Sequence, residues 1–118
     1  MLVDDEPDVN ITLKITLEEN GFKVDSFTDP LLALSNFKPD SYDLVILDIK
    51  MPKMNGFELY RQIKKIDDKV KVCFLTAGEM YYGVYGDIFN TLDANCFIRK
   101  PIENKMLIKR LNTIIIVK

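Results

Sequence analysis

Several kinds of residue and segment are scarce or missing in this chain, and each absence argues against a class of function. The 118 residues contain no histidine and two cysteines. A zinc site would therefore need two distant cysteines and carboxylates, and we set zinc chemistry aside. The apolar runs are only a few residues long, whereas a bilayer-spanning helix needs roughly 20. We expect a soluble, cytoplasmic protein.

The charge balance and the cysteines narrow the possibilities further. The net charge is -2, from 16 basic and 18 acidic side chains, so no overall positive field attracts nucleic acid. We expect no direct DNA binding by this chain. Cys73 and Cys96 both lie in apolar stretches, which favours buried free thiols over a disulfide.

The composition predicts one globular domain over residues 1–118. Apolar residues make up 47% of the chain and charged residues 29%, which is ordinary for a folded domain. A chain of this length buries about two thirds of the surface that its unfolded form exposes. No repeat, linker or low-complexity segment divides it.

Apolar patterns and turn residues predict strands that alternate five times with helices. We expect strands at 1–3, 22–27, 43–47, 70–75 and 96–98, and helices at 7–20, 30–37, 57–66, 79–92 and 103–117. This alternation predicts the α/β class, with a doubly wound parallel five-stranded sheet and helices on both faces.

The first helix is ambiguous in the sequence. Apolar and polar residues alternate strictly from 9 to 17, which by pattern alone is typical of a strand. Pro7 before this segment and Asn20-Gly21 after it favour a helix instead. On a helix Ile11 and Ile15 point away from the core, where they either form a partner surface or pack under a neighbouring loop.

Polar side chains stand where four of the five predicted strands end. They are Asp4 and Asp5, Asp48, Thr76 and Lys100. Taken singly, each has a plainer interpretation as a helix cap or loop residue. The carboxyl ends of parallel strands meet at one edge of a sheet, however, so we expect these side chains to form one site.

Such a site has a definite chemistry. Three clustered carboxylates raise one another's pKa unless a cation is present, and ligands that are all oxygens suit Mg²⁺. A carboxylate beside Mg²⁺ can attack phosphorus, and Asp48 is the best candidate because it ends the central strand. Lys100 and Thr76 would then neutralise the equatorial oxygens of the phosphoryl group.

Four motifs strengthen this interpretation. The chain resembles a response-regulator receiver domain of two-component signalling, in the stretches LVDDEPD (2–8), YDLVILDIKMPKMNGFEL (42–59), FLTA (74–77) and FIRKPI (97–102). The resemblance covers essentially the whole chain. It implies a (βα)5 domain with the flavodoxin-like strand order 2-1-3-4-5, an order that receivers are known to share.

The resemblance also implies specific roles. Asp48 corresponds to the phosphoacceptor, Asp5 to a direct Mg²⁺ ligand, Asp4 to a ligand acting largely through water, and Lys50 to the residue whose backbone carbonyl binds the metal. Thr76 and Lys100 correspond to the residues that contact the phosphoryl oxygens.

Other positions correspond to parts of the family's switch. Phe97 corresponds to the aromatic whose rotamer changes on phosphorylation, although an ordinary core aromatic is an equal alternative. Lys50 and Gly78 occupy the two positions that tune phosphoryl lifetime, and here they suggest a long-lived acyl phosphate. Asp93 stands where receivers usually carry glycine, so the 79–92 helix, which is part of the signalling face in receivers, ends without its usual glycine cap. Two interpretations follow from this, an atypical output partner or a mobile helix.

The resemblance implies a Mg²⁺-dependent switch that receives its phosphoryl group from a sensor histidine kinase or a phosphotransfer protein and controls an unknown output partner. It would catalyse only its own phosphorylation and autodephosphorylation. Receivers can also dimerise through the fourth helix, fifth strand and fifth helix. Two alternatives remain: an interaction module that works without phosphorylation, and a Mg²⁺-dependent phosphatase. A flavin or nucleotide binder is disfavoured, because no glycine-rich loop follows the first strand.

Overall fold

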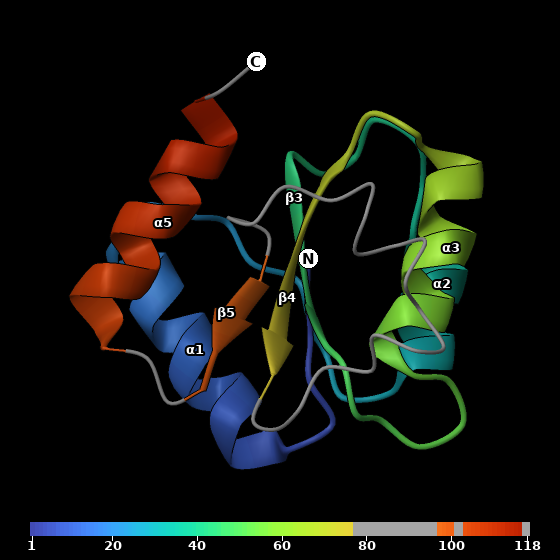
Figure 1. The fold of residues 1–118 in the computed structure, drawn as a ribbon, viewed down its shortest axis with the longest axis horizontal. Helices are drawn as coiled ribbons and strands as arrows, with labels where there is room; N and C mark the ends of the chain where they lie inside the picture. Colours follow the sequence, from blue (N-terminus) through green and yellow to red (C-terminus); the bar gives the residue numbers. More distant parts are fainter. Residues whose placement is uncertain (77–96, 101–102, 117–118) are drawn as a thin grey trace.

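The protein folds as a five-stranded sheet with helices on both faces (Figure 1). The computed structural model describes residues 1–76, 97–100 and 103–116. Its strands are β1 (Leu2–Val3), β2 (Ser26–Phe27), β3 (Leu44–Asp48), β4 (Lys71–Thr76) and β5 (Phe97–Arg99). Its described helices are α1 (Pro7–Glu19), α2 (Pro30–Asn36), α3 (Gly56–Ile66) and α5 (Asn104–Ile116).

All of the strand pairs are parallel, and the order is β2-β1-β3-β4-β5. The predicted fold class and strand order are therefore confirmed. The helices α1 and α5 cover one face of the sheet, and α2 and α3 cover the other (Figure 1). The predicted helix at 79–92 lies outside the described residues.

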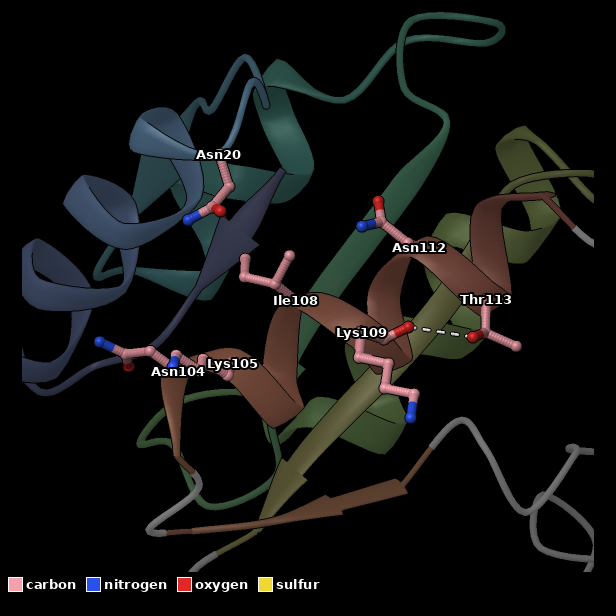
Figure 2. A pocket seen from close by; sticks show the side chains of 7 residues that line it. All are labelled: Asn20, Asn104, Lys105, Ile108, Lys109, Asn112 and Thr113. Carbon is pink, nitrogen blue, oxygen red and sulfur yellow. Dashed lines mark hydrogen bonds between the residues drawn. The ribbon is translucent and has the colours of Figure 1, made fainter.

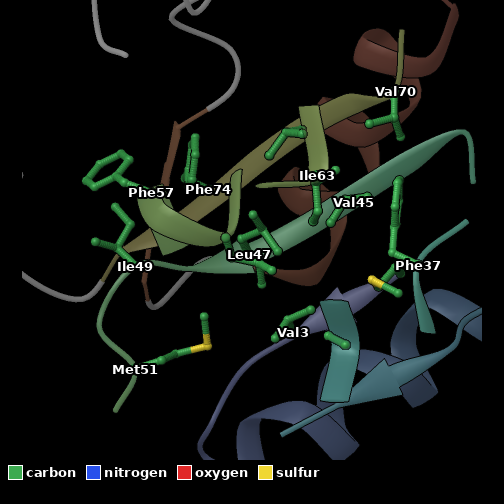
Figure 3. Packing of buried hydrophobic residues seen from close by; sticks show 14 residues of the cluster. Val3, Phe37, Val45, Leu47, Ile49, Met51, Phe57, Ile63, Val70 and Phe74 are labelled. Atoms are coloured by element: carbon green, nitrogen blue, oxygen red, sulfur yellow. The ribbon is translucent and has the colours of Figure 1, made fainter. Parts of the chain in front are cut away.

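The continuous apolar run of β3 is explained by these two layers. Val45 and Leu47 point into the cluster under α2 and α3, together with Phe57 and Phe74 (Figure 3). Leu44 and Ile46 point into the opposite cluster, and the buried α5 residues Leu107, Leu111 and Ile114 cover that side. A strand that is buried on both faces needs apolar residues at every position, which is what residues 44–47 provide.

The ambiguous segment forms the helix α1, as predicted from its flanking residues. Leu17 is buried on its inner side, while the side chains of Ile11 and Ile15 are 58% and 52% exposed. Pro7 occupies the first turn, where its missing N–H costs nothing. The strand-like alternation in the sequence arose from apolar residues on two opposite sides of a helix.

The second strand is shorter than predicted. Pairing with β1 is limited to Ser26 and Phe27, which lie opposite Leu2 and Val3. Phe22 and Val24 instead pack against the cluster under α1 and α5. The apolar pattern correctly indicated that these residues pack inward. It could not show where strand pairing begins, because pairing depends on the distant segment β1.

Two smaller findings complete the comparison. Cys73 is buried and belongs to no disulfide, as predicted, and Cys96 lies outside the described residues. In the part of the chain that the structure describes, no helix combines the length and the apolar character needed to cross a membrane.

Candidate functional site

Four strands bring polar side chains to the carboxyl edge of the sheet. Asp4 follows β1, Asp48 ends β3, Thr76 ends β4, and Lys100 follows β5. Asp4 is 0% exposed, and Asp48 and Thr76 are each 5% exposed. Buried charges need partners, so the contacts between these groups determine what the site can do.

Lys100 lies among three carboxylates. Its Nζ atom is 2.7 Å from Oδ2 of Asp4, 3.4 Å from Oδ1 of Asp48 and 3.9 Å from Oε1 of Glu6. The backbone N–H of Lys100 donates to the carbonyl of Thr76 at 2.7 Å, which anchors the lysine to the end of β4. Three of the predicted site residues thus meet at one ion-pair cluster.

Burial raises the pKa of Asp48 to about 7, with a further increase from the charge of Asp4 and from a hydrogen bond with Asp5. The charge of Lys100 opposes this shift without cancelling it. Burial also lowers the pKa of the Lys100 ammonium, but its hydrogen bond to Asp4 and the nearby charges outweigh burial, so that pKa is raised. Lys100 therefore stays positive, and the site favours an additional cation.

The donor set suits Mg²⁺. Among the described residues, Asp4, Glu6 and Asp48 each offer a carboxylate oxygen, and these three oxygens lie within 4.8 Å of one another. Oxygen donors that keep access to solvent are the ligands that Mg²⁺ prefers, and the exposed position of Glu6 provides that access. Asp5 is half-buried beside this group, and its assignment as a direct ligand stays a prediction.

Sequence reasoning missed Glu6. Its acidic side chain directly follows Asp5, but no strand pattern places residue 6 at the site. Its position depends on the turn between β1 and α1, in which the Glu6 N–H donates to Oδ1 of Asp4 at 3.0 Å. The only sign of its role in the sequence was that it is the third acid in a row after the first strand.

The loop after β3 fixes the backbone of Asp48. Asn55 caps α3, and its side chain and that of Glu58 form a reciprocal capping box. The N–H of Gly56 donates to the carbonyl of Ile49 at 2.8 Å. A Cβ atom at Gly56 would stand 2.3 Å from the backbone oxygen of Asp48, so only glycine allows this close approach.

The predicted switch and lifetime residues lie outside this ion-pair cluster or outside the described residues. Phe97 is half-buried in β5 and stacks on Phe74, with 5.3 Å between the ring centroids. Lys50 is exposed just after β3. Gly78 lies outside the described residues.

A groove of about 680 Å³ lies elsewhere, between the end of α1 and α5 (Figure 2). Its lining residues are Asn20, Asn104, Lys105, Ile108, Lys109, Asn112 and Thr113. Among the described residues, Asp4, Asp48, Thr76 and Lys100 are not part of this lining.

Comparison with known proteins agrees with this geometry. The family model described as "Response regulator receiver domain" matches residues 1–112. The chain is 38% identical over 116 residues to the "Transcriptional regulatory protein CpxR homolog" of Haemophilus influenzae, covering 98% of this chain and 49% of that protein. It is 29% identical to the response regulator SaeR of Staphylococcus aureus, with the same two coverages. The chain therefore spans about half the length of these curated relatives.

Solved structures agree as well. The non-phosphorylated HemR receiver domain from Leptospira biflexa superposes with a TM-score of 0.86 at 30% identity, covering 99% of this chain and 93% of that one. A CheY-like receiver domain protein from Methanospirillum hungatei superposes with a TM-score of 0.81 at 24% identity, covering 97% and 90%, and supports the fold alone.

Proposed function

This chain belongs to the response regulator receiver family, whose standard function is phosphorylation-based switching, and we propose that Asp48 is its phosphoacceptor. The donor would be the phosphohistidine of a sensor histidine kinase or of a phosphotransfer protein. The receiver domain would extend over residues 1–118.

The observation that carries the proposal is the convergence of Asp4, Asp48 and Lys100 at one sheet edge. Segments 96 residues apart in the sequence form the 2.7 Å contact between Lys100 and Asp4. A chain that served only as an interaction module would have no need to bury these charges together, since burying them costs free energy.

In the proposed reaction a carboxylate oxygen of Asp48 forms a bond to phosphorus as the bond between phosphorus and the histidine nitrogen breaks. Lys100 would stabilise the charge on the equatorial oxygens, and Thr76 would donate its hydroxyl to one of them. A Mg²⁺ ion would be held by Asp5, Asp48 and the carbonyl of Lys50, with Asp4 acting largely through water. When bound, it supplies neutralisation of the phosphoryl charge.

Switching would then follow from the movement of Thr76 towards the phosphoryl group and of Phe97 to another rotamer. Stacking of Phe97 on Phe74 supports an inward starting position for that ring. We propose that the altered surface regulates an output partner, and that dimerisation through the fourth helix, fifth strand and fifth helix is one form of this regulation.

The test is phosphorylation by a small phosphodonor with Mg²⁺, followed by intact-mass measurement. The wild type should gain one phosphoryl group, and Asp48→Asn should gain none. Asp43→Asn is the matched control, because Asp43 is an exposed acid immediately before the other end of β3, and this variant should be labelled normally. Removal of the metal with a chelator should abolish labelling.

Other results would favour other functions. A wild type that binds partners but gains no phosphoryl group from any donor would be an interaction module. Repeated turnover of phosphoesters would indicate a phosphatase, whereas we propose that the chain catalyses only its own phosphorylation and autodephosphorylation.

The lifetime of the phosphorylated state is a separate proposal. Gly78 offers no side chain to orient a hydrolytic water, and a long side chain at Lys50 can shield the phosphoryl group. We expect slow decay, and faster decay in Gly78→Glu. Equal rates for the two proteins would contradict this proposal.

A cytoplasmic location and the lack of direct DNA binding by this chain also stay predictions.

A further inference from the structure

Asn10 is a buried polar residue on the inner side of α1, only 4% exposed. Its side-chain Nδ2 donates two hydrogen bonds, to the carbonyl of Asp4 at 3.1 Å and to the carbonyl of Phe27 at 2.9 Å. One amide therefore joins the ends of two neighbouring strands, β1 and β2, to the helix that follows β1. A buried amide with two good acceptors is well satisfied, so its position is well defined.

Together with other hydrogen bonds, these bonds hold the backbone and the side chain of Asp4 in place. The N–H of Asp4 donates to the carbonyl of Phe27 at 3.1 Å. Its carboxylate accepts from the N–H of Glu6 at 3.0 Å and from Lys100 at 2.7 Å. With the Asn10 bond to its carbonyl, the backbone donor, the backbone acceptor and both carboxylate oxygens of Asp4 all have partners.

The Asp4 carbonyl that accepts from Asn10 affects the orientation of the next residue, Asp5. It belongs to the planar peptide unit that joins Asp4 to Asp5, so the position of its oxygen determines the orientation of that whole unit. The direction in which the chain enters Asp5, and hence the direction of the Asp5 carboxylate, depends on this orientation. The same unit leads on to Glu6, whose carboxylate belongs to the cluster of possible metal ligands.

We propose that Asn10 is a positioning residue for the cation site, which fixes the Asp4-Asp5 peptide so that the carboxylates at this edge are preorganised for Mg²⁺. The proposal rests on the proposed function, because it presupposes that Mg²⁺ binds there. Asn10 itself would not contact the metal, because its amide nitrogen donates to two backbone carbonyls. Partners that orient metal ligands typically contribute about 10- to 100-fold to metal affinity.

A purely structural role would predict something different. Loss of Asn10 would then lower stability, as loss of any buried hydrogen bond does, and leave metal affinity unchanged once the protein is folded. Thr16 offers the matched control on the same helix. Thr16 is also buried, and its Oγ1 donates to the carbonyl of Thr12 at 3.0 Å. Thr16 lies about 9 Å from Asn10 along the helix axis, because each residue adds 1.5 Å.

The experiment measures the Mg²⁺ dissociation constant of the unphosphorylated protein by titration calorimetry, and the melting temperature without metal. Asn10→Ala should weaken Mg²⁺ binding by about tenfold or more. Thr16→Ala should lose stability but keep its dissociation constant within about twofold, because distant substitutions act independently. The Mg²⁺ concentration for half-maximal phosphorylation should rise in Asn10→Ala, with the rate at saturating Mg²⁺ largely retained.

The outcomes separate the two levels of the proposal. A wild type that binds Mg²⁺ and an Asn10→Ala variant with the same affinity would overturn the role of Asn10 alone. An equal loss of affinity in Thr16→Ala would also overturn it, since the effect would then be general. A wild type without Mg²⁺ binding would overturn the proposed function as well. If Asn10→Ala does not fold, Asn10→Ser replaces it, because a short hydroxyl cannot reach both carbonyls and the same weakening is expected.

Discussion

At the scale of single residues, Lys100 and Lys53 show how strongly burial changes the value of an ion pair. Lys100 is 14% exposed and contacts Asp4, which has no exposed side-chain surface. Lys53 forms a 3.5 Å pair with Asp29, but its side chain is 60% exposed. Water and salt screen the second pair and leave the first almost unscreened.

We therefore predict that Lys100→Met lowers the free energy of unfolding by about 3 kcal/mol in chelator, because two buried carboxylates lose their cation. Lys53→Met, the matched control, should cost less than about 1 kcal/mol. Urea denaturation without metal measures both. Mg²⁺ should restore part of the loss in Lys100→Met, and equal costs for the two variants would contradict the electrostatic interpretation.

Tyr42 provides a prediction for alkaline pH. Burial raises the pKa of Tyr42 to about 12, and its 2.7 Å hydrogen bond to Asp25 adds to the shift. Below about pH 10 the phenol is neutral in both the folded and unfolded states, so its contribution to stability is complete. Between pH 10 and 12 only the unfolded state ionises, and stability should fall. In thermal melts, Tyr42→Phe should lose less stability than the wild type between pH 10 and 12. Identical pH profiles for the two proteins would show that Tyr42 does not contribute to this loss.

At the scale of elements, the loop from β3 to α3 determines how the strand that carries Asp48 ends. Gly56 lies against the backbone of Asp48, whereas a Cβ atom at Gly21 would meet nothing within 4 Å. Gly21 has a φ of +89°, so alanine there would strain only its own backbone. The two glycines are thus needed for different physical reasons.

Gly56→Ala should destabilise the protein by about 3 kcal/mol, because the new methyl group forces the backbone of Asp48 or the start of α3 to move. Gly21→Ala should cost about 1 kcal/mol, the usual penalty for a left-handed conformation. Phosphorylation should slow in Gly56→Ala and be unchanged in Gly21→Ala when both are assayed well below their melting temperatures. Normal labelling of Gly56→Ala would show that Asp48 tolerates the displacement.

Features with a local cause could be predicted from the sequence, whereas features that depend on distant contacts could not. The run from Leu44 to Leu47 and the acid that ends it were readable, because burial on both faces leaves a continuous apolar pattern. The short β2 was not, because pairing at Ser26 and Phe27 depends on the register with β1. The contributions of Glu6 and Asn10 were missed, because they depend on the turn into α1 and on contacts across the sheet, which no periodicity encodes.

At the scale of the whole molecule, we expect the site to couple the stability of the fold to metal binding. Asp48 is buried beside Asp4, and both factors raise the pKa of Asp48 because they disfavour its charged form. The folded protein without metal therefore holds a carboxylate at neutral pH in an unfavourable environment. Any cation that binds only the folded state adds to its stability by mass action.

Two measurements follow from this coupling. In chelator at pH 8, Asp48→Asn should melt at a higher temperature than the wild type, because one clustered negative charge is gone. Mg²⁺ at 100 times its dissociation constant should stabilise the wild type by about 2.7 kcal/mol, and Asp48→Asn by much less, since its affinity for the metal is reduced. Asp43→Asn should behave like the wild type in both solutions. If Mg²⁺ stabilised Asp48→Asn as much as the wild type, the cation would bind away from Asp48, and the sheet edge would not be the metal site.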